Sequence, residues 1–404
     1  MNPSAPGWIK KHLTYLLNHL STHPQDERGM YAQLRYSGFI YGTSKSTLSD
    51  EESQLLNWTE EEKTKINLFD ALACTFYNEK ETTNSEGEDC ITAILAFYEA
   101  VNYEYKKGGF SFIKESNYDR LEKIVDNRIQ TNEPLLKKNF SHLITNALLY
   151  IDVLAFKHFI NTQTSPYDYA KHMEAVVIQT VWIAISTTQI KDRQEQKKGA
   201  YNELLMKLFE RSIRYNNWPI TNSLDITQVI HDITHPLEKS YILDICALAL
   251  GSDQEIDSKE NLFIEQVCNY LTITPQEKTE SLNSIIRFID IHKENISYLQ
   301  YSNPIQHFYN QVNNTVSTLI LRNKKRLIKE ITQSKELAIL LTKSTTRELA
   351  KDEKKIVRKQ LLDICKTVPS LAIFLLPGGS ILMPLLVKFI PKLLPSAFNE
   401  NMED

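Results

Sequence analysis

The sequence predicts an all-α protein, and three observations carry that prediction. Apolar residues recur at intervals of three and four; between Trp8 and Leu20 they occupy positions 8, 9, 13, 16, 17 and 20. Glycine, which weakens helices, supplies only 11 of 404 residues, while helix-forming Leu, Lys and Glu are abundant. No stretch shows the apolar–polar alternation that is typical of a β-strand. We therefore expect a multi-helix array that ends in a basic helix and a proline-broken apolar helical hairpin.

The first half of the chain contains a series of further helical patterns, which cover 60–78, 89–105, 117–128, 136–161 and 167–187. Three glutamates after Thr59 predict the start of the first of these helices, because a helix N-terminus favours negative charge. The stretches 141–156 and 175–186 are strongly apolar. Asp152 interrupts the first and the second is short, so both predict buried core helices rather than membrane spans. The aromatic stretch Arg35–Gly42 predicts a buried turn, with ligand stacking as the alternative.

Pattern breaks and charge divide the chain into four predicted parts. These are an N-terminal helical domain (1–222), a smaller helical module (223–300), a basic helical region (301–366) and an apolar proline-rich motif (367–398). Residues 318–404 hold 16 Lys and Arg against 9 Asp and Glu, a net charge of +7. Residues 1–317 hold 30 and 41, a net charge of −11. This asymmetry predicts an acidic body and a basic tail that seeks anionic partners.

The sequence offers no positive evidence for catalysis. His231 and His235 have the spacing of a zinc site, but a zinc protease needs Glu directly after the first His, where this chain has Asp232. Because Pro236 follows the second His, we interpret the motif as a helix edge. The five cysteines are scattered without a CxxC pair and predict neither a disulfide framework nor a zinc site. We therefore expect a protein that is not an enzyme and has no resident cofactor.

An acidic loop follows the apolar helix predicted over 237–251. Its Asp and Ser residues can cap the next helix, and its carboxylates are also ligands that a hard divalent cation prefers. The stretch resembles the TerB-like (tellurite-resistance) helical domain, whose Asp-x-Glu-Ile-x-x-x-Glu pattern is matched here, although Gln254 stands where that family usually has Gly. The resemblance implies a divalent cation, with helix capping as the favoured alternative, at Asp253, Glu255 and Glu260.

The end of the chain combines a long apolar stretch with residues that interrupt helices. Val368–Val387 contains 20 residues without a charge, enough for a helix that crosses a bilayer core of about 30 Å. Prolines and a glycine pair break it, so we expect short helical pieces that dip into a membrane or need neighbours to cross it. The residues assigned to this membrane motif are Pro369, Pro377, Gly378, Gly379, Pro384, Lys388, Pro391 and Pro395.

A basic helix precedes the apolar stretch. A basic helix is most often only a solvated face, but its position beside an apolar segment favours contact with anionic lipid, and RNA phosphates are the second candidate. The residues predicted to make this contact are Lys351, Lys354, Lys355, Arg358 and Lys359.

The basic helix and the prolines together resemble the LETM domain. That domain belongs to the leucine-zipper/EF-hand transmembrane proteins of the mitochondrial inner membrane and their bacterial relatives. The residues that carry the resemblance are the basic helix Leu349–Pro369, the prolines at 369, 377, 384, 391 and 395, and the closing Leu394-Pro-Ser-Ala-Phe398. The whole layout is similar to bacterial LETM-related biofilm-associated proteins. The resemblance implies membrane association, with ion homeostasis or ribosome binding.

From these observations we expect a membrane-associated scaffold of envelope or ion homeostasis, or of biofilm growth. The N-terminus lacks a secretory signal, so we expect the bulk of the chain in the cytoplasm. The expected partners are membrane lipids, the ribosome and a second copy of the chain, with no DNA. One alternative is a subunit of a cation or proton transporter. The other is a soluble helical interaction protein with a buried tail.

Overall fold

The computed structural model is all-α, which confirms the predicted fold class. It describes residues 1–22, 26–48, 58–80, 87–101, 115–129, 146–162, 164–188, 213–215, 225–250, 258–292 and 319–367, together with 371, 386, 387 and 390. Within these ranges the chain forms helices and turns and contains no β-strand. The boundaries predicted near residues 222 and 300 lie outside the described ranges.

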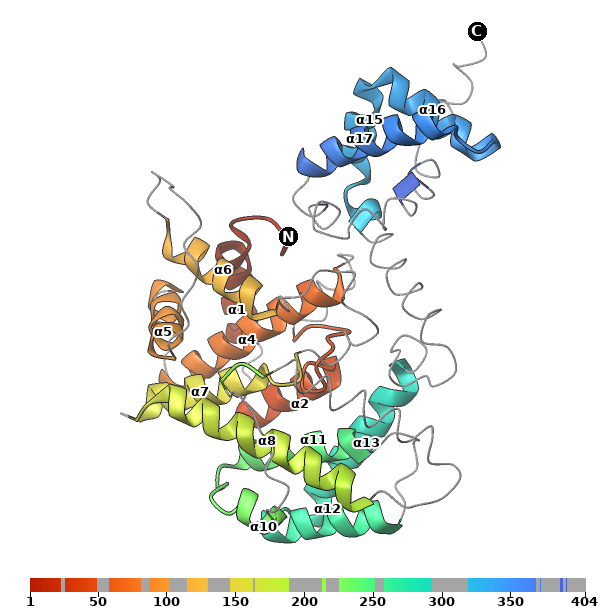
Figure 1. The fold of residues 1–404 in the computed structure, drawn as a ribbon. Coiled ribbons are helices and arrows are strands. Elements are labelled where there is room, and N and C mark those ends of the chain that lie inside the picture. Colours follow the sequence, from red (N-terminus) through yellow and green to blue (C-terminus); the bar gives the residue numbers. More distant parts are fainter. Residues whose placement is uncertain are drawn as a thin grey trace.

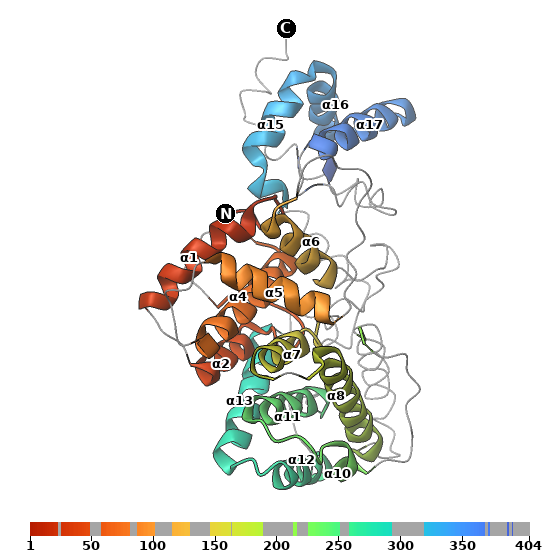
Figure 2. The ribbon, with the colours of Figure 1, turned by 90° about the vertical axis from the view of Figure 1, so that its left-hand side faces the viewer.

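The body of the protein is a layered helical array (Figures 1 and 2). The long helix α4 packs against α2, α5, α6 and α7, and α8 continues the array from α7 to α11 and α12. The helices of the body are α1 (Trp8–Thr22), α2 (Glu27–Ser37), α4 (Glu60–Lys80), α5 (Gly87–Ala100), α6 (Asn117–Ile129), α7 (Tyr150–Asn161), α8 (Pro166–Thr188), α10 (Ile226–Val229), α11 (Pro236–Leu250), α12 (Ser258–Tyr270) and α13 (Pro275–His292).

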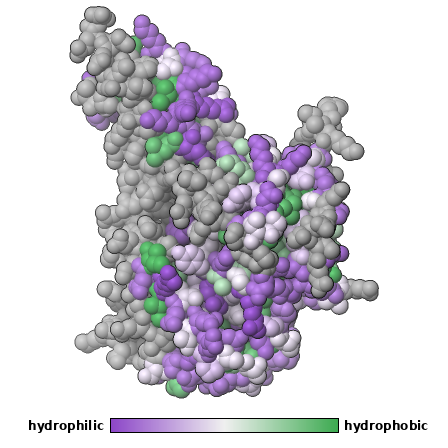
Figure 3. Space-filling model, turned by 180° about the vertical axis from the view of Figure 1, so that it is seen from behind, coloured by the Kyte–Doolittle hydropathy of each residue, from purple (hydrophilic) through white to green (hydrophobic). Residues whose placement is uncertain are grey.

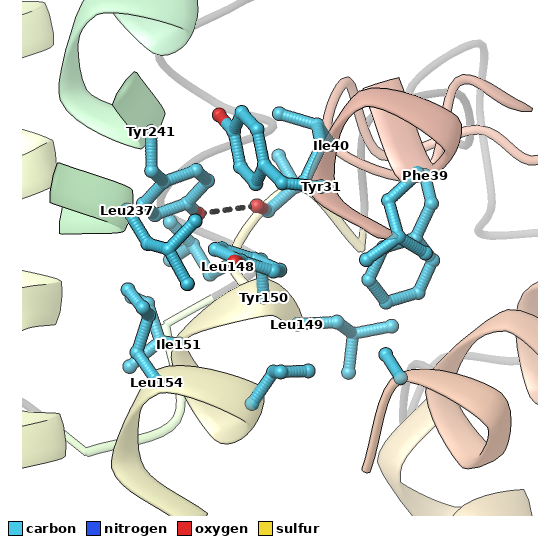
Figure 4. Packing of buried hydrophobic residues seen from close by; sticks show 14 of the residues in the cluster. Tyr31, Phe39, Ile40, Leu148, Leu149, Tyr150, Ile151, Leu154, Leu237 and Tyr241 are labelled. Atoms are coloured by element: carbon cyan, nitrogen blue, oxygen red, sulfur yellow. Dashed lines mark hydrogen bonds between the residues drawn. The ribbon is translucent and has the colours of Figure 1, made fainter. Parts of the chain in front are cut away.

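Three buried tyrosines mark the place where distant parts of the body meet (Figure 4). Tyr150 of α7 lies between Tyr31 of α2 and Tyr241 of α11, with ring centroids 5.2 Å apart in both pairs. The Tyr241 hydroxyl donates to the Ala147 carbonyl at 2.6 Å. The first apolar stretch predicted as a core helix is buried where the structure describes it, although α7 begins at Tyr150 and residues 146–149 form a turn. The second, 175–186, is buried for the most part, but Trp182 and Ile183 are half-buried and Ser186 is exposed.

A buried carboxylate ties α2, α11 and α13 together. Asp244 accepts hydrogen bonds from the Tyr31 hydroxyl at 2.5 Å, from Arg35 Nε at 2.8 Å and from the Ser281 hydroxyl at 2.5 Å. Its side chain is fully buried, so these partners offset the cost of removing the charge from water. Burial, reinforced by the charge of Asp244, raises the pKa of Tyr31 well above its ordinary value.

The turn after α2 is buried from Gly38 to Gly42, as predicted, but Tyr36 of the predicted stretch Arg35–Gly42 lies on α2 and is 56% exposed. Gly38 caps α2 in the left-handed region, with φ of 84°. A Cβ atom at this position would lie 2.3 Å from the Thr43 carbonyl oxygen, so the turn requires glycine both by conformation and by space. Tyr41 then packs on Phe288 of α13, with ring centroids 4.8 Å apart.

The C-terminal unit has a hydrophobic core of its own, separate from that of the body. Its helices are α15 (Lys324–Gln333), α16 (Lys335–Thr346) and α17 (Lys351–Thr367), which pack on one another. They form the blue group at the top of Figure 1. Among the described helices of the whole chain, none is both long enough and apolar enough for a bilayer crossing.

Candidate functional site

Helix α17 holds the predicted anion-contact residues, and its two ends are fixed by specific contacts. At its start, Glu353 accepts from the Ala350 amide at 2.8 Å and pairs with Arg347 at 2.6 and 2.8 Å. The hydrogen bond from Arg347 lowers the pKa of Glu353 to about 2. At its end, Arg326 of α15 donates to the Thr367 carbonyl at 2.5 Å, where the helix dipole favours positive charge.

A polar bridge sets the position of α17 against α16. Ser334 caps α16 by accepting from the Leu337 amide at 3.3 Å, and its hydroxyl donates to Gln360 Oε1 at 2.7 Å. The Gln360 amide nitrogen donates in turn to Glu336 at 2.7 Å. Because Gln360 lies in the middle of α17, these bonds fix which side of that helix faces the unit's core.

Helix α17 is amphipathic, and its polar side is basic. Val357, Leu361, Ile364 and Cys365 are buried in the unit's core. The five predicted contact residues all lie exposed on this helix, and they are Lys351, Lys354, Lys355, Arg358 and Lys359. Residues three and four positions apart share one side of a helix, so most of these charges form a stripe. Figure 3 shows mainly hydrophilic side chains on the described surface of this unit, at the top of the view.

Few of the basic residues on α17 are paired with an acidic side chain. Lys354 lies 3.2 Å from Glu348, in an exposed pair. Within the part of the chain that the structure describes, the other four basic residues form no ion pair, although the charge of Lys359 helps to lower the pKa of Asp363 after the bond and charge of Lys366. The stripe, defined as these five residues, is therefore a concentration of positive charge on a helix whose two ends are held by specific contacts.

Few residues of the predicted membrane motif are described. Pro369, Pro377, Gly378, Gly379, Pro384, Lys388, Pro391 and Pro395 all lie outside the described residues. Within the same stretch, Leu371, Leu386 and Ile390 are at most 1% exposed and belong to the unit's core, and Val387 packs against that core. At these four positions the apolar stretch contacts protein.

The predicted metal ligands are described only in part. Asp253 and Glu255 lie outside the described residues, and Glu260 is a buried residue in the first turn of α12. The residues that the structure describes contain no group of three or more His, Cys, Asp or Glu side chains arranged to hold a metal ion. The cation at this loop stays a prediction.

The histidine motif does not place two imidazoles on one helix. His231 is exposed in the turn after α10, and its Nδ1 lies 2.9 Å from the Gln228 carbonyl. His235 precedes α11, and its Nδ1 accepts from the Leu237 amide at 3.2 Å. The second histidine therefore serves a helix N-terminus, in agreement with the helix edge that Pro236 indicated.

Sequence reasoning missed the ion pair between Arg322 and Glu62, which are 2.5 Å apart. The capping pattern of Thr59 and Glu62 is visible in the sequence, and it forms: the Thr59 amide donates to Glu62 at 2.9 Å. Nothing in a single sequence indicates that an arginine 260 positions later joins the same carboxylate.

Fold and surface thus define an all-α body joined to a small basic unit with its own core. Residues 349–404 of this chain match the family described as LETM1-like, RBD, a ribosome-binding domain. The match covers α17 and the apolar stretch, 56 of 404 residues, and it supports the LETM resemblance of this segment. No curated protein and no solved structure matches the chain.

Proposed function

We propose that this protein is a non-enzymatic adapter whose C-terminal unit docks on the ribosome through phosphate groups of ribosomal RNA. The observation that carries the proposal is the basic stripe of α17, which lies in the segment that matches the LETM1-like ribosome-binding family. The stripe is presented on a helix whose opposite side is packed and whose two ends are fixed.

The chemistry of the stripe suits phosphates more than bases. Lysine and arginine bind backbone phosphates and release counterions, a contact that carries no sequence information. Helix α17 contains no aromatic residue on which an unstacked base could lie. The proposal is therefore recognition of an RNA surface by charge and shape.

Salt-dependent co-sedimentation with purified ribosomes tests this function. The variant replaces Lys355, Arg358 and Lys359 by Gln, and the matched control replaces Lys11, Arg28 and Lys80, three exposed basic residues of the body. Each phosphate contact contributes about 0.7–0.9 to the slope of log affinity against log salt, so the variant should lower the slope by about 2. Equal slopes for the variant and the control would contradict the proposal.

A second proposal is association with an anionic membrane surface. It is supported by the uncharged stretch Val368–Val387 beside a basic helix, an arrangement that favours acidic lipid head groups. Flotation with vesicles that contain acidic lipid, against vesicles of neutral lipid alone, tests it. If the protein floats with neither kind of vesicle, the proposal of membrane association is wrong.

Further proposals are more specific. Envelope or ion homeostasis, biofilm-linked scaffolding and a TerB-like module with a divalent cation rest on resemblance. Self-association rests on the proline-broken apolar stretch, which needs neighbours to cross a membrane, and a cytoplasmic location for the bulk of the chain rests on the lack of a secretory signal at the N-terminus. A titration of the purified chain with calcium, followed by calorimetry, tests the cation at Asp253, Glu255 and Glu260. The absence of heat from specific binding would assign those carboxylates to helix capping.

A further inference from the structure

The body and the C-terminal unit are folded separately but meet at a charged contact. The body's buried core extends from Trp8 to Ile289, and the core of the C-terminal unit begins at Leu319. Arg322 of the C-terminal unit reaches Glu62 at the start of α4, with Nη1 and Oε2 2.5 Å apart. The side chains of Arg322 and Glu62 are 15% and 2% exposed, so the pair is largely shielded from water.

Glu62 is held in place by the body itself. Its Oε2 accepts from the Thr59 amide at 2.9 Å and from the Thr59 hydroxyl at 3.2 Å, and its Oε1 accepts from the Ser4 hydroxyl. The first turn of α4 favours a negative charge here. Burial acts to raise the pKa of Glu62, but the hydrogen bonds from Arg322 and Ser4 outweigh it and lower the pKa. The carboxylate is therefore a preorganised receptor for a cation.

Arg322 is much less completely satisfied. Its Nε and Nη2 atoms are buried without a hydrogen-bond partner among the residues described. Arg128 of the body, in contrast, engages Asp152 through both Nε and Nη2. Leaving two guanidinium donors buried and unpaired offsets much of the attraction between the charges. The contact therefore fixes one position of the C-terminal unit but contributes little net free energy. A contact of this kind can form and break reversibly.

We propose that Arg322 and Glu62 form an electrostatic latch that holds the C-terminal unit against the body. The latch opens when salt screens the attraction between the two oppositely charged parts of the chain, or when a polyanion competes for the basic C-terminal unit. The latch fixes the direction in which the stripe of α17 points. The opposite net charges of residues 1–317 (−11) and 318–404 (+7) add a longer-range attraction that salt screens within about 10 Å at 0.1 M. The inference does not depend on what the stripe binds.

Energy transfer between one dye on each unit tests the latch in the full chain. Thr14 of α1 and Gln333 of α15 are exposed, and replacing each by Cys provides labelling sites, because the five native cysteines are buried. Arg322→Met removes the latch but leaves the Thr59–Glu62 cap intact. Lys325→Met, an exposed lysine of α15, is the control with the same change of charge.

At low salt the latched chain should give one narrow distribution of energy-transfer efficiency. The Lys325→Met control should give the same distribution. Arg322→Met should broaden the distribution, as should high salt or a short polyanionic RNA added to the parent chain. The double variant Glu62→Gln with Arg322→Met should broaden the distribution no more than Arg322→Met does, because both substitutions remove the same contact. Circular dichroism checks that each variant is folded. A narrow, unshifted distribution for folded Arg322→Met would overturn the proposal.

Discussion

Breaking the buried ion pair between Arg128 and Asp152 should destabilise the body strongly. Asp152 is the residue that interrupts the apolar stretch 141–156, and its side chain is fully buried in α7. Arg128 of α6 donates to it from Nε at 2.7 Å and also from Nη2. The hydroxyls of Tyr98 and Tyr215 add bonds of 3.2 and 3.0 Å. The carboxylate is thus charged, buried and satisfied chiefly by one arginine.

The size of the effect follows from this environment. Arg128→Met leaves Asp152 buried with the two tyrosine hydroxyls as its hydrogen-bond partners and the charge of Arg214 nearby. Breaking one side of a buried pair costs about 3–5 kcal/mol. Replacing both residues, Arg128→Met with Asp152→Leu, removes the unpaired charge, so the double variant should be more stable than the single one. Arg120→Met on the same helix is the control, because Arg120 forms an exposed pair with Glu99 that contributes about 0–1 kcal/mol.

Urea unfolding followed by circular dichroism measures these differences. The free energy of unfolding should fall by about 3–5 kcal/mol for Arg128→Met and by at most about 1 kcal/mol for Arg120→Met, with unchanged dependence on urea concentration. The reasoning is refuted if the two single variants are equally stable, because the buried carboxylate would then not need its arginine.

Three further outcomes are expected. Gly38→Ala should cost about 1–3 kcal/mol in urea unfolding, because φ is 84° and the new Cβ would meet the Thr43 carbonyl; equal stability would show that the turn can shift. Leu361→Ala should cost about 2–5 kcal/mol, seen as earlier thermal unfolding of the C-terminal unit alone, and a matching loss in the body would contradict its separate core. The lowered pKa of Glu62 means that the latch is fully present above the ordinary carboxyl value of 4.5 and is lost as pH falls through the folded value. Energy transfer should therefore be constant from pH 8 to pH 5 and broaden only at lower pH.

Local features of the fold could be predicted from the sequence because they depend on neighbouring residues. The glutamates after Thr59 predicted the start of α4, which begins at Glu60. The period of apolar residues predicted α1, and the apolar turn around Gly38 is buried. Each of these depends on residues within a few positions of one another, where helix dipoles, capping and side-chain periodicity act directly.

The contacts that organise the molecule could not be predicted, because they join residues far apart in the chain. Arg128 meets Asp152 across 24 positions, Tyr31 meets Asp244 across 213, and Arg322 meets Glu62 across 260. A charged residue needs a partner if its side chain is buried. The sequence does not indicate which residue the packing brings to it. For the same reason the sequence located the basic residues of α17 but not the bonds that orient the helix.

The described tail positions limit how the C-terminal unit can meet another surface. Leu371, Leu386 and Ile390 are buried in the core that also holds Leu361 of α17. Apolar side chains that already cover a protein core gain nothing further from lipid unless that core opens. The exposed side of α17 is mainly basic, so in this arrangement the proposed contact with RNA or with a membrane would be made through charge. Anionic lipid and RNA should then compete for the same stripe. The glutamine variant of Lys355, Arg358 and Lys359 should weaken binding to both.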